Sequence, residues 1–223
     1  MKVDFSLLQL LSSRLAHDLV GPVGSLGFAI DIIKEEANLD NQEAISLAST
    51  SAQNLVNRLS FFRMALGFAK LGQGERGFLE AKELLLNLFK EKNIKVTWEG
   101  DSEKLLLLAA DNDNIKLIIN TFLIIYYATS KSAKVTVFVK EVKDKVGVAL
   151  LADGTNLRLS SDNLQSLRME VEEKDLTARN IHSYFTALLA KKVNANLEIS
   201  NDTTENIQIA YLLNKIRFNN NLL

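Results

Sequence analysis

Residues 12–24 decide how the rest of this chain is organised, and they read Ser12-Ser13-Arg14-Leu15-Ala16-His17-Asp18-Leu19-Val20-Gly21-Pro22-Val23-Gly24. The stretch holds one of two histidines and the single proline of the 223-residue chain. Apolar side chains recur through it at intervals of three and four residues, at Leu8, Leu11, Leu15, Leu19, Val23, Leu26, Ile30 and Ile33. This spacing predicts an amphipathic helix that runs from about Asp4 to Ala37.

His17 does not belong to the apolar stripe. At about 100° per residue it lies roughly opposite the midpoint of Leu15 and Leu19, so we expect its imidazole to face solvent. Pro22 has no amide hydrogen, and we expect it to bend or loosen the helix one turn beyond the histidine. The residues on the histidine's own face, one turn away, are Ser13, Arg14, Gly21 and Gly24.

Each of the two glycines lowers the stability of the helix by about 1 kcal/mol relative to alanine, so another advantage of glycine on this face is expected. Close approach of another molecule to the histidine is one reason. A surface histidine beside a kink that serves packing only is the alternative, and the residue types alone leave both open.

The pattern His17-Asp18-Leu19-x-x-Pro22-Val23 resembles the phospho-acceptor box of sensor histidine kinases. The longer string, from Ser13 to Gly24, is similar to ChpT-type histidine phosphotransferases of alphaproteobacterial phosphorelays, which carry phosphoryl groups without using ATP. The resemblance implies that His17 is the phospho-acceptor and that Asp18 orients or polarises its imidazole. It also implies that the face formed by Arg14, Ser13, Gly21 and Gly24 is where a receiver domain docks.

The expected function is therefore that of a phosphoryl carrier in a phosphorelay. His17 would shuttle a phosphoryl group between the receiver-domain aspartates of a hybrid histidine kinase and of response regulators. We expect no cofactor and no metal site in this chain, because the receiver domain supplies the magnesium. A non-catalytic dimeric scaffold related to histidine kinases and an ATP-dependent histidine kinase are the two alternatives.

The composition of the chain limits the classes of partner that it is expected to bind. With 26 basic and 27 acidic residues the formal charge is −1, which gives no support for binding to nucleic acid or a membrane surface. The chain has no cysteine, and two histidines alone make a poor metal-ligand set. The longest apolar run, Phe122–Ala128, is too short to span a bilayer, so we expect a cytoplasmic protein.

A second heptad-like seam follows the first helix. Its apolar positions keep an unbroken alternation of three and four: Ile45, Ala48, Ala52, Leu55, Leu59, Phe62, Leu66 and Ala69. Residues 1–70 are thus predicted to form a helical hairpin, with a turn at 38–41, that exposes much apolar surface when alone. Two such hairpins would form a four-helix bundle, so we expect a homodimer, the alternative being a hairpin that folds back on its own chain.

The glycine-rich stretch Gly67–Gly77 marks a domain boundary, with a linker at 71–77 and a second domain at 78–223. The second domain is predicted to be an α/β sandwich, which makes the whole chain α+β. Helices are expected at Phe78–Lys92, Asn114–Thr129, Ser161–Met169 and Asp175–Val193. Strands are expected at Ile94–Trp98, Leu105–Ala109, Val135–Val142, Val146–Ala152, Ala195–Ser200 and Ile207–Leu213.

This order of elements resembles the ATP-binding domain of histidine kinases, but the parts that would bind the nucleotide are missing. Kinases present two magnesium-binding asparagines four residues apart, whereas here Asn120 is followed by Ile124, which cannot ligate magnesium. Asp153-Gly154 keeps only a fragment of the adenine-reading motif, and no glycine follows Gly154 to form a phosphate-binding lid. We therefore expect a degenerate domain without ATP binding, and we interpret His182 as a structural or surface residue.

Overall fold

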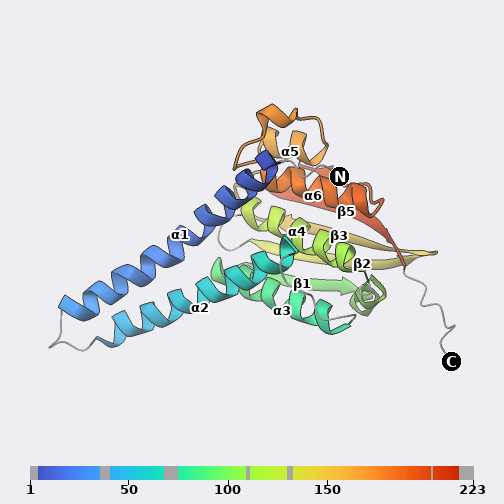
Figure 1. Cartoon of the computed structure of the whole chain (residues 1–223). Helices are drawn as coiled ribbons and strands as arrows, with labels where there is room; N and C mark the ends of the chain where they lie inside the picture. Colours follow the sequence, from blue (N-terminus) through green and yellow to red (C-terminus); the bar gives the residue numbers. More distant parts are fainter. Residues whose placement is uncertain are drawn as a thin grey trace, which may run out of the picture.

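The computed structural model describes residues 5–35, 41–67, 75–108, 111–129, 133–201 and 203–215. A helical hairpin projects from an α/β domain, and its two helices, α1 (Phe5–Glu35) and α2 (Gln42–Ala65), run antiparallel side by side (Figure 1). α1 stays helical on both sides of Pro22. The predicted first residue of the helix, Asp4, and the turn residues 38–40 lie outside the described residues.

The α/β domain contains a five-stranded sheet with the strand order β1-β2-β3-β5-β4. β1 is parallel to β2, and the remaining neighbours are antiparallel. The strands are β1 (Lys95–Gly100), β2 (Lys134–Val142), β3 (Lys145–Asp153), β4 (Glu198–Ser200) and β5 (Asn206–Asn214). The helical elements are α3 (Glu75–Glu91), η1 (Ser102–Leu108), α4 (Asn112–Ala128), α5 (Ser161–Leu167), η2 (Glu173–Asp175) and α6 (Ile181–Lys192). This α+β architecture confirms the predicted fold class.

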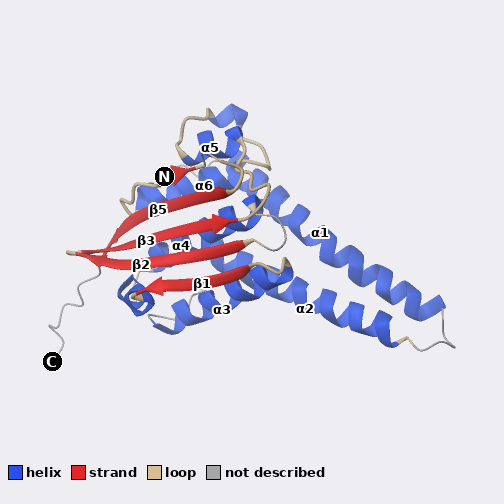
Figure 2. Cartoon of the chain, turned by 180° about the vertical axis from the view of Figure 1, so that it is seen from behind, coloured by secondary structure: helices blue, strands red, loops and turns tan. Residues whose placement is uncertain are grey.

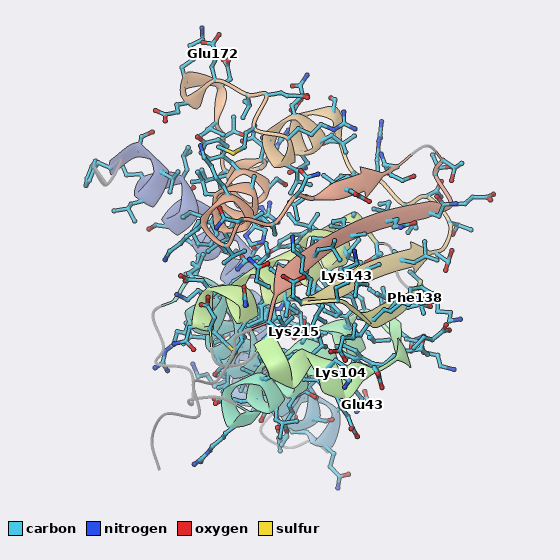
Figure 3. All side chains as sticks on the ribbon, turned by 90° about the vertical axis from the view of Figure 1, so that its right-hand side faces the viewer. Glu43, Lys104, Phe138, Lys143, Glu172 and Lys215 are labelled. Atoms are coloured by element: carbon cyan, nitrogen blue, oxygen red, sulfur yellow. The ribbon has the colours of Figure 1, made fainter. Side chains whose placement is uncertain are left out.

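Helices α3, α4 and α6 lie together on one face of the sheet (Figure 2). Side chains of β2, β3 and β5 alternate between this covered face and the opposite one, and the apolar ones on the covered face are buried. Thr136 of β2 is buried as well, on the opposite face. Phe138 is 39% exposed between the buried Val137 and Val139, and in Figure 3 it projects from the face away from α4. The α/β domain thus has two layers, the sheet and the helices α3, α4 and α6, and none of the described helices covers the other face of the sheet (Figure 2).

α4 is the helix through which the two parts of the chain are joined. Nearly all of its residues are buried, because it packs on the sheet and also contacts α2, α3 and α6. Asn120 in its middle donates from Nδ2 to the carbonyl of Ala65, at the end of α2, over 2.9 Å. A helix that is apolar on all sides is expected in such a position.

Ion pairs connect η1, β2 and the residue that follows β5 at the end of the sheet where the β2–β3 turn lies. Lys104 Nζ lies 3.1 Å from Glu141 Oε2, and Lys215 binds Glu141 Oε1 as well as the carbonyl of Lys143. Figure 3 shows Lys104, Lys143 and Lys215 near one another at this end. The contacts hold the last described residue of the chain against the β2–β3 hairpin.

Three predicted elements differ from the structure. The strand predicted at Leu105–Ala109 is wrong, since the 3-10 helix η1 occupies this region and its three-residue repeat buries Leu105 and Leu108. The helix predicted from Asp175 begins at Ile181 instead, because the Asn180 side chain accepts from the Thr177 amide and holds the chain in a turn. The predicted linker lies mostly outside the described residues, and its last three residues, 75–77, belong to α3.

His182 lies in the core, on α6. It is only 6% exposed, its ring meets that of Tyr127 edge-on with centroids 6.1 Å apart, and it hydrogen-bonds the backbone of Asn120. Burial lowers the pKa of His182 to about 4, so the imidazole is neutral in the folded protein near neutral pH. This position fits the structural role that the sequence suggested.

Burial of a neutral histidine makes the free energy of unfolding depend on pH. The unfolded chain binds a proton at His182 below about pH 6.5, whereas the folded chain resists protonation until about pH 4. Stability is therefore lost as the pH falls through this window, by about 2 kcal/mol between pH 7 and pH 5. Denaturant unfolding at the two pH values should show this loss in the wild type. His182→Asn, which replaces the imidazole N–H donor by an amide N–H donor, should lose clearly less stability between the two pH values. An equal loss of stability in both proteins would contradict the assignment of this pH dependence to His182.

Candidate functional site

The structure places His17 on the outer face of α1, as the helical spacing predicts. Its side chain is 81% exposed. Ser13, Gly21 and Gly24 are exposed as well, and a Cβ added at either glycine would meet no atom of this chain within 4 Å. The face around His17 is therefore open to another molecule.

Asp18, next to this histidine, is fixed by contacts from two helices. Its Oδ2 accepts a hydrogen bond from Arg14 Nε at 3.0 Å and another from the hydroxyl of Tyr127 on α4. Its Oδ1 lies 3.4 Å from His17 Nδ1. Since the Asp18 side chain is only 10% exposed, one carboxylate oxygen is saturated by protein donors and the other is directed to the imidazole.

Arg14 and Tyr127 also bind each other. The Arg14 guanidinium carbon lies 4.1 Å from the centroid of the Tyr127 ring, in a cation–π contact. Burial first, and then the Asp18 carboxylate, raise the pKa of Tyr127 far above its ordinary value, so the phenol keeps its proton and remains a donor. The stacked pair therefore forms a fixed wall on one side of Asp18.

The backbone carbonyl of Asp18 is held by a third element. In a regular helix this carbonyl would accept from the amide four residues on, but that residue is Pro22, which has no amide hydrogen. Arg58 on α2 donates from Nη1 to the Asp18 carbonyl at 3.0 Å instead. Arg58 is itself fixed by Glu91 Oε2 of α3, which lies 2.6 Å from Nη2.

Sequence reasoning found the residues on α1 but missed the two that come from elsewhere, Arg58 and Tyr127. Both are distant in sequence from His17, and neither lies in a recognisable motif. One signal was present, because a proline four residues after Asp18 implies a carbonyl that needs another donor. Phe28, which is 63% exposed and about three helical turns beyond His17, was also missed on the same face.

The arrangement can present a nucleophile. An exposed neutral imidazole whose Nδ1–H is directed to a carboxylate leaves the lone pair of Nε2 facing solvent. Among the residues that the structure describes, no group of three or more His, Cys, Asp or Glu side chains could hold a metal ion. The chemistry that these residues support is transfer to and from the imidazole.

The residues that kinases use for magnesium and nucleotide have structural roles here. The Nδ2 of Asn120 donates to the carbonyls of Ala65 and Lys116, and its Oδ1 is buried in the core without a hydrogen-bond partner among the described residues. Ile124 is 3% exposed. A Cβ at Gly154 would lie 3.1 Å from the Cβ of Ala133, so this glycine allows two segments to pack closely.

Comparison with known proteins identifies the family. Residues 78–205 match the family model of the histidine phosphotransferase C-terminal domain. The chain is 27% identical to the protein phosphotransferase ChpT of Brucella abortus over 190 residues, which cover 85% of this chain and 88% of that protein.

A solved structure of a phosphotransferase supports the fold. A bacterial phosphotransferase structure superposes with a TM-score of 0.75 at 23% identity, covering 95% of this chain and 98% of the other. The histidine kinase AdeS of Acinetobacter baumannii matches less well, with a TM-score of 0.48 at 9% identity over 89% of this chain and 98% of that one. The chain belongs to the histidine phosphotransferase family.

Proposed function

We propose that this histidine phosphotransferase carries the phosphoryl group of a phosphorelay on Nε2 of His17. One observation carries the proposal: His17 is 81% exposed, while the carboxylate beside it is almost completely buried and held by two donors. A mobile surface histidine would need no such support. The support fixes one imidazole nitrogen and leaves the other free to react.

The transfer step follows from this geometry. The lone pair of His17 Nε2 attacks the phosphorus of a receiver's aspartyl phosphate, the P–O bond breaks, and the receiver's aspartate leaves as a carboxylate. The imidazole ring gains positive charge while Nδ1 keeps its proton, and the Asp18 carboxylate stabilises that charge. Transfer to a second receiver is the reverse of these events. The receiver supplies the magnesium in both directions.

The receiver's docking surface is proposed to be the outer face of α1 around His17. Ser13, Gly21 and Gly24 leave room there, and Phe28 adds an exposed aromatic side chain farther along the same face. Aromatic side chains surrounded by small residues are frequent anchors of protein interfaces. Arg14 lies at the edge of this face and can offset part of the phosphoryl charge.

Neither alternative function fits the site as well. An ATP-dependent kinase needs an asparagine oxygen that a magnesium ion can reach, but Asn120 is fully buried and solvent does not reach its Oδ1. A scaffold that had lost transfer would gain nothing from a buried carboxylate directed to His17. We therefore propose that the chain uses no nucleotide or metal of its own and receives the phosphoryl group only from partner proteins.

The hairpin is proposed to form a homodimer through a four-helix bundle. Besides Phe28, which belongs to the docking face, apolar side chains on both helices remain exposed in one copy: Val20, Val23, Ile30, Ile45, Leu47, Val56 and Leu59. A soluble monomer rarely exposes so many on one projecting element. A second hairpin packed alongside would cover most of them and leave His17 at the surface.

The apolar character of α1 has a second interpretation. By length and mean hydropathy, which reaches 1.2 over an 18-residue window, α1 could span a membrane, and 6% of that window is buried. However, Arg14, His17 and Asp18 lie near its middle, where charged groups in a bilayer are costly. We therefore assign the exposed apolar surface to the bundle and place the protein in the cytoplasm.

Three substitutions separate the roles at the site. His17→Ala should fold normally and lose all transfer, because an exposed side chain contributes little to stability. Asp18→Ala should slow transfer by about 10- to 100-fold, and Tyr127→Phe by about tenfold, since each loosens the orientation of the imidazole. The measurement is single-turnover transfer of label from a phosphorylated receiver. Tyr126→Phe is the matched control, because its hydroxyl makes only a long contact of 3.4 Å to Arg58.

Retention of transfer by His17→Ala, or label on His182, would refute the assignment. A Tyr127→Phe rate equal to that of Tyr126→Phe would show that the phenol has no part in orienting Asp18.

Bulk added on the docking face should weaken receiver binding without harming the fold. Gly24→Leu introduces a side chain where a Cβ meets nothing within 4 Å, so the thermal midpoint should not fall. Receiver affinity, measured by titration calorimetry, should drop by about tenfold or more because the side chain occupies the space of the partner. Gly24→Ala, a smaller change at the same position, should bind more tightly than Gly24→Leu. Equal affinity of Gly24→Leu and wild type would exclude this face as the docking site.

The dimer can be tested on the seam of α2. Sedimentation of the wild type without detergent should give about twice the chain mass of 24.8 kDa. Leu59→Glu and Ile45→Glu, at positions that are 44% and 55% exposed in one copy, should give monomers because a buried charge disrupts an apolar interface. Leu79→Glu, on α3 and 51% exposed, is the matched control and should stay dimeric. A wild type that remains monomeric at high concentration would contradict the proposal.

A further inference from the structure

A cavity of about 330 Å³ opens beside the transfer site, between α1, α4, α5 and α6. Its apolar floor is made by Ile124, Ala128 and Leu159. Its polar lining includes Arg14, Tyr127, Arg158, Arg179, His182 and Ser183. Arg14 and Tyr127 are the donors that hold Asp18, but the mechanism above gives the rest of this lining no role.

The cavity carries uncompensated positive charge. Arg158 and Arg179 are both exposed, and neither forms an ion pair with another residue that the structure describes. Arg14 is the third arginine of the lining, but it is already paired with Asp18, and Asp162 contributes one carboxylate. Arg158 and Arg179 therefore provide the forked donors that match the oxygens of a phosphate or carboxylate.

The first turn of α6 adds a second attraction for an anion. His182 and Ser183, which line the cavity, are the second and third residues of this helix. Asn180, at the N-cap position, provides no side-chain cap, because its Oδ1 accepts from the Thr177 amide and hydroxyl instead. The positive end of a 12-residue helix is thus left without the usual oxygen acceptor.

A third sign of incomplete bonding is His182 itself. Its side chain is more than nine-tenths buried, and its Nε2 has no hydrogen-bond partner among the described residues. Because the imidazole is neutral and its other nitrogen bonds the Asn120 backbone, this Nε2 carries a lone pair, and it can accept a hydrogen bond from a hydroxyl or from a protonated phosphate oxygen. Since His182 lines the cavity, the imidazole also reports on anything that enters.

We propose that this cavity binds a phosphate group, either free or carried on a small organic molecule. Phosphate is favoured over a carboxylate because its three or four oxygens can engage several arginines and the helix end together. The arginines supply the positive charge that magnesium would otherwise provide, so binding needs no metal. Ser183 donates to Asn163 Oδ1 over 2.7 Å, so the remaining acceptor capacity of these two side chains is what a hydroxyl attached to the phosphate could use.

Occupancy of the cavity would also reach the transfer site, and this consequence alone rests on the proposed function. Arg14 lines the cavity, and its Nε is the donor that lies 3.0 Å from Asp18 Oδ2. A phosphate group would compete with Asp18 for that guanidinium. The transfer rate at His17 should therefore change when the cavity is filled.

Binding is tested first, without transfer. The full-length protein is titrated by calorimetry with inorganic phosphate and with ribose 5-phosphate, at constant ionic strength and without magnesium. At least one probe should bind saturably, and Arg158→Gln/Arg179→Gln should weaken it by about tenfold or more. Arg76→Gln/Arg168→Gln, which removes the same charge from exposed positions outside the cavity, should bind like the wild type. Magnesium-ATP serves as a further arm and should not bind more tightly than ribose 5-phosphate.

The site of binding is tested by nitrogen-15 NMR of the two imidazoles, assigned with His17→Ala. The resonances of His182 should shift in proportion to saturation. The proposal is overturned if neither phosphate probe binds, if both double variants weaken binding equally, or if binding leaves the His182 signals unchanged. Binding that passes these tests but does not alter transfer would uphold the site and refute only its coupling to His17.

Discussion

The structure around His17 depends on how Asp18 is held. Its carboxylate is bound by Arg14 and by Tyr127 of α4, and its carbonyl is bound by Arg58 of α2. Three helices that belong to different parts of the chain therefore meet at one residue. His17 needs no contacts of its own, because its neighbour supplies a fixed acceptor while the imidazole itself stays in solvent.

The burial of the Asp18 side chain explains why the contacts around it can be rigid. Asp18 lies where its charge would be costly if unpaired, so the loss of either donor on Oδ2 would leave a partly buried carboxylate undersatisfied. Tyr127 can serve as a donor because a phenol keeps its proton at neutral pH, and burial raises its pKa further. Arg58 can reach the carbonyl because Glu91 fixes the guanidinium from the other side. Each contact depends on a second one that holds the donor in place.

The sequence predicted the features that follow from periodicity. The apolar stripe around Leu15 and Leu19 predicted both α1 and the exposure of His17, and alternation predicted the β2–β3 and β4–β5 pairs. The prediction from sequence failed before α6, where the Asn180 side chain competes with the backbone for hydrogen bonds. It also failed at Leu105, where a three-residue repeat is too short to distinguish from a strand. Arg58 and Tyr127 could not be found, because their role exists only once α2 and α4 are packed against α1. The presence of Pro22 was seen, but a local kink was expected from it and not a bond to another helix.

The hydrogen bond from Asn120 to Ala65 has a consequence for how partners recognise this protein. It is buried, and it joins the middle of α4 to the last turn of α2, so the hairpin cannot rotate against the α/β domain without leaving the amide and the carbonyl unpaired. The surface formed by the hairpin and the α/β domain is therefore preorganised. A protein that docks on it would cause little loss of conformational entropy in this chain. Fidelity between partners can then be set by the shape of both parts together.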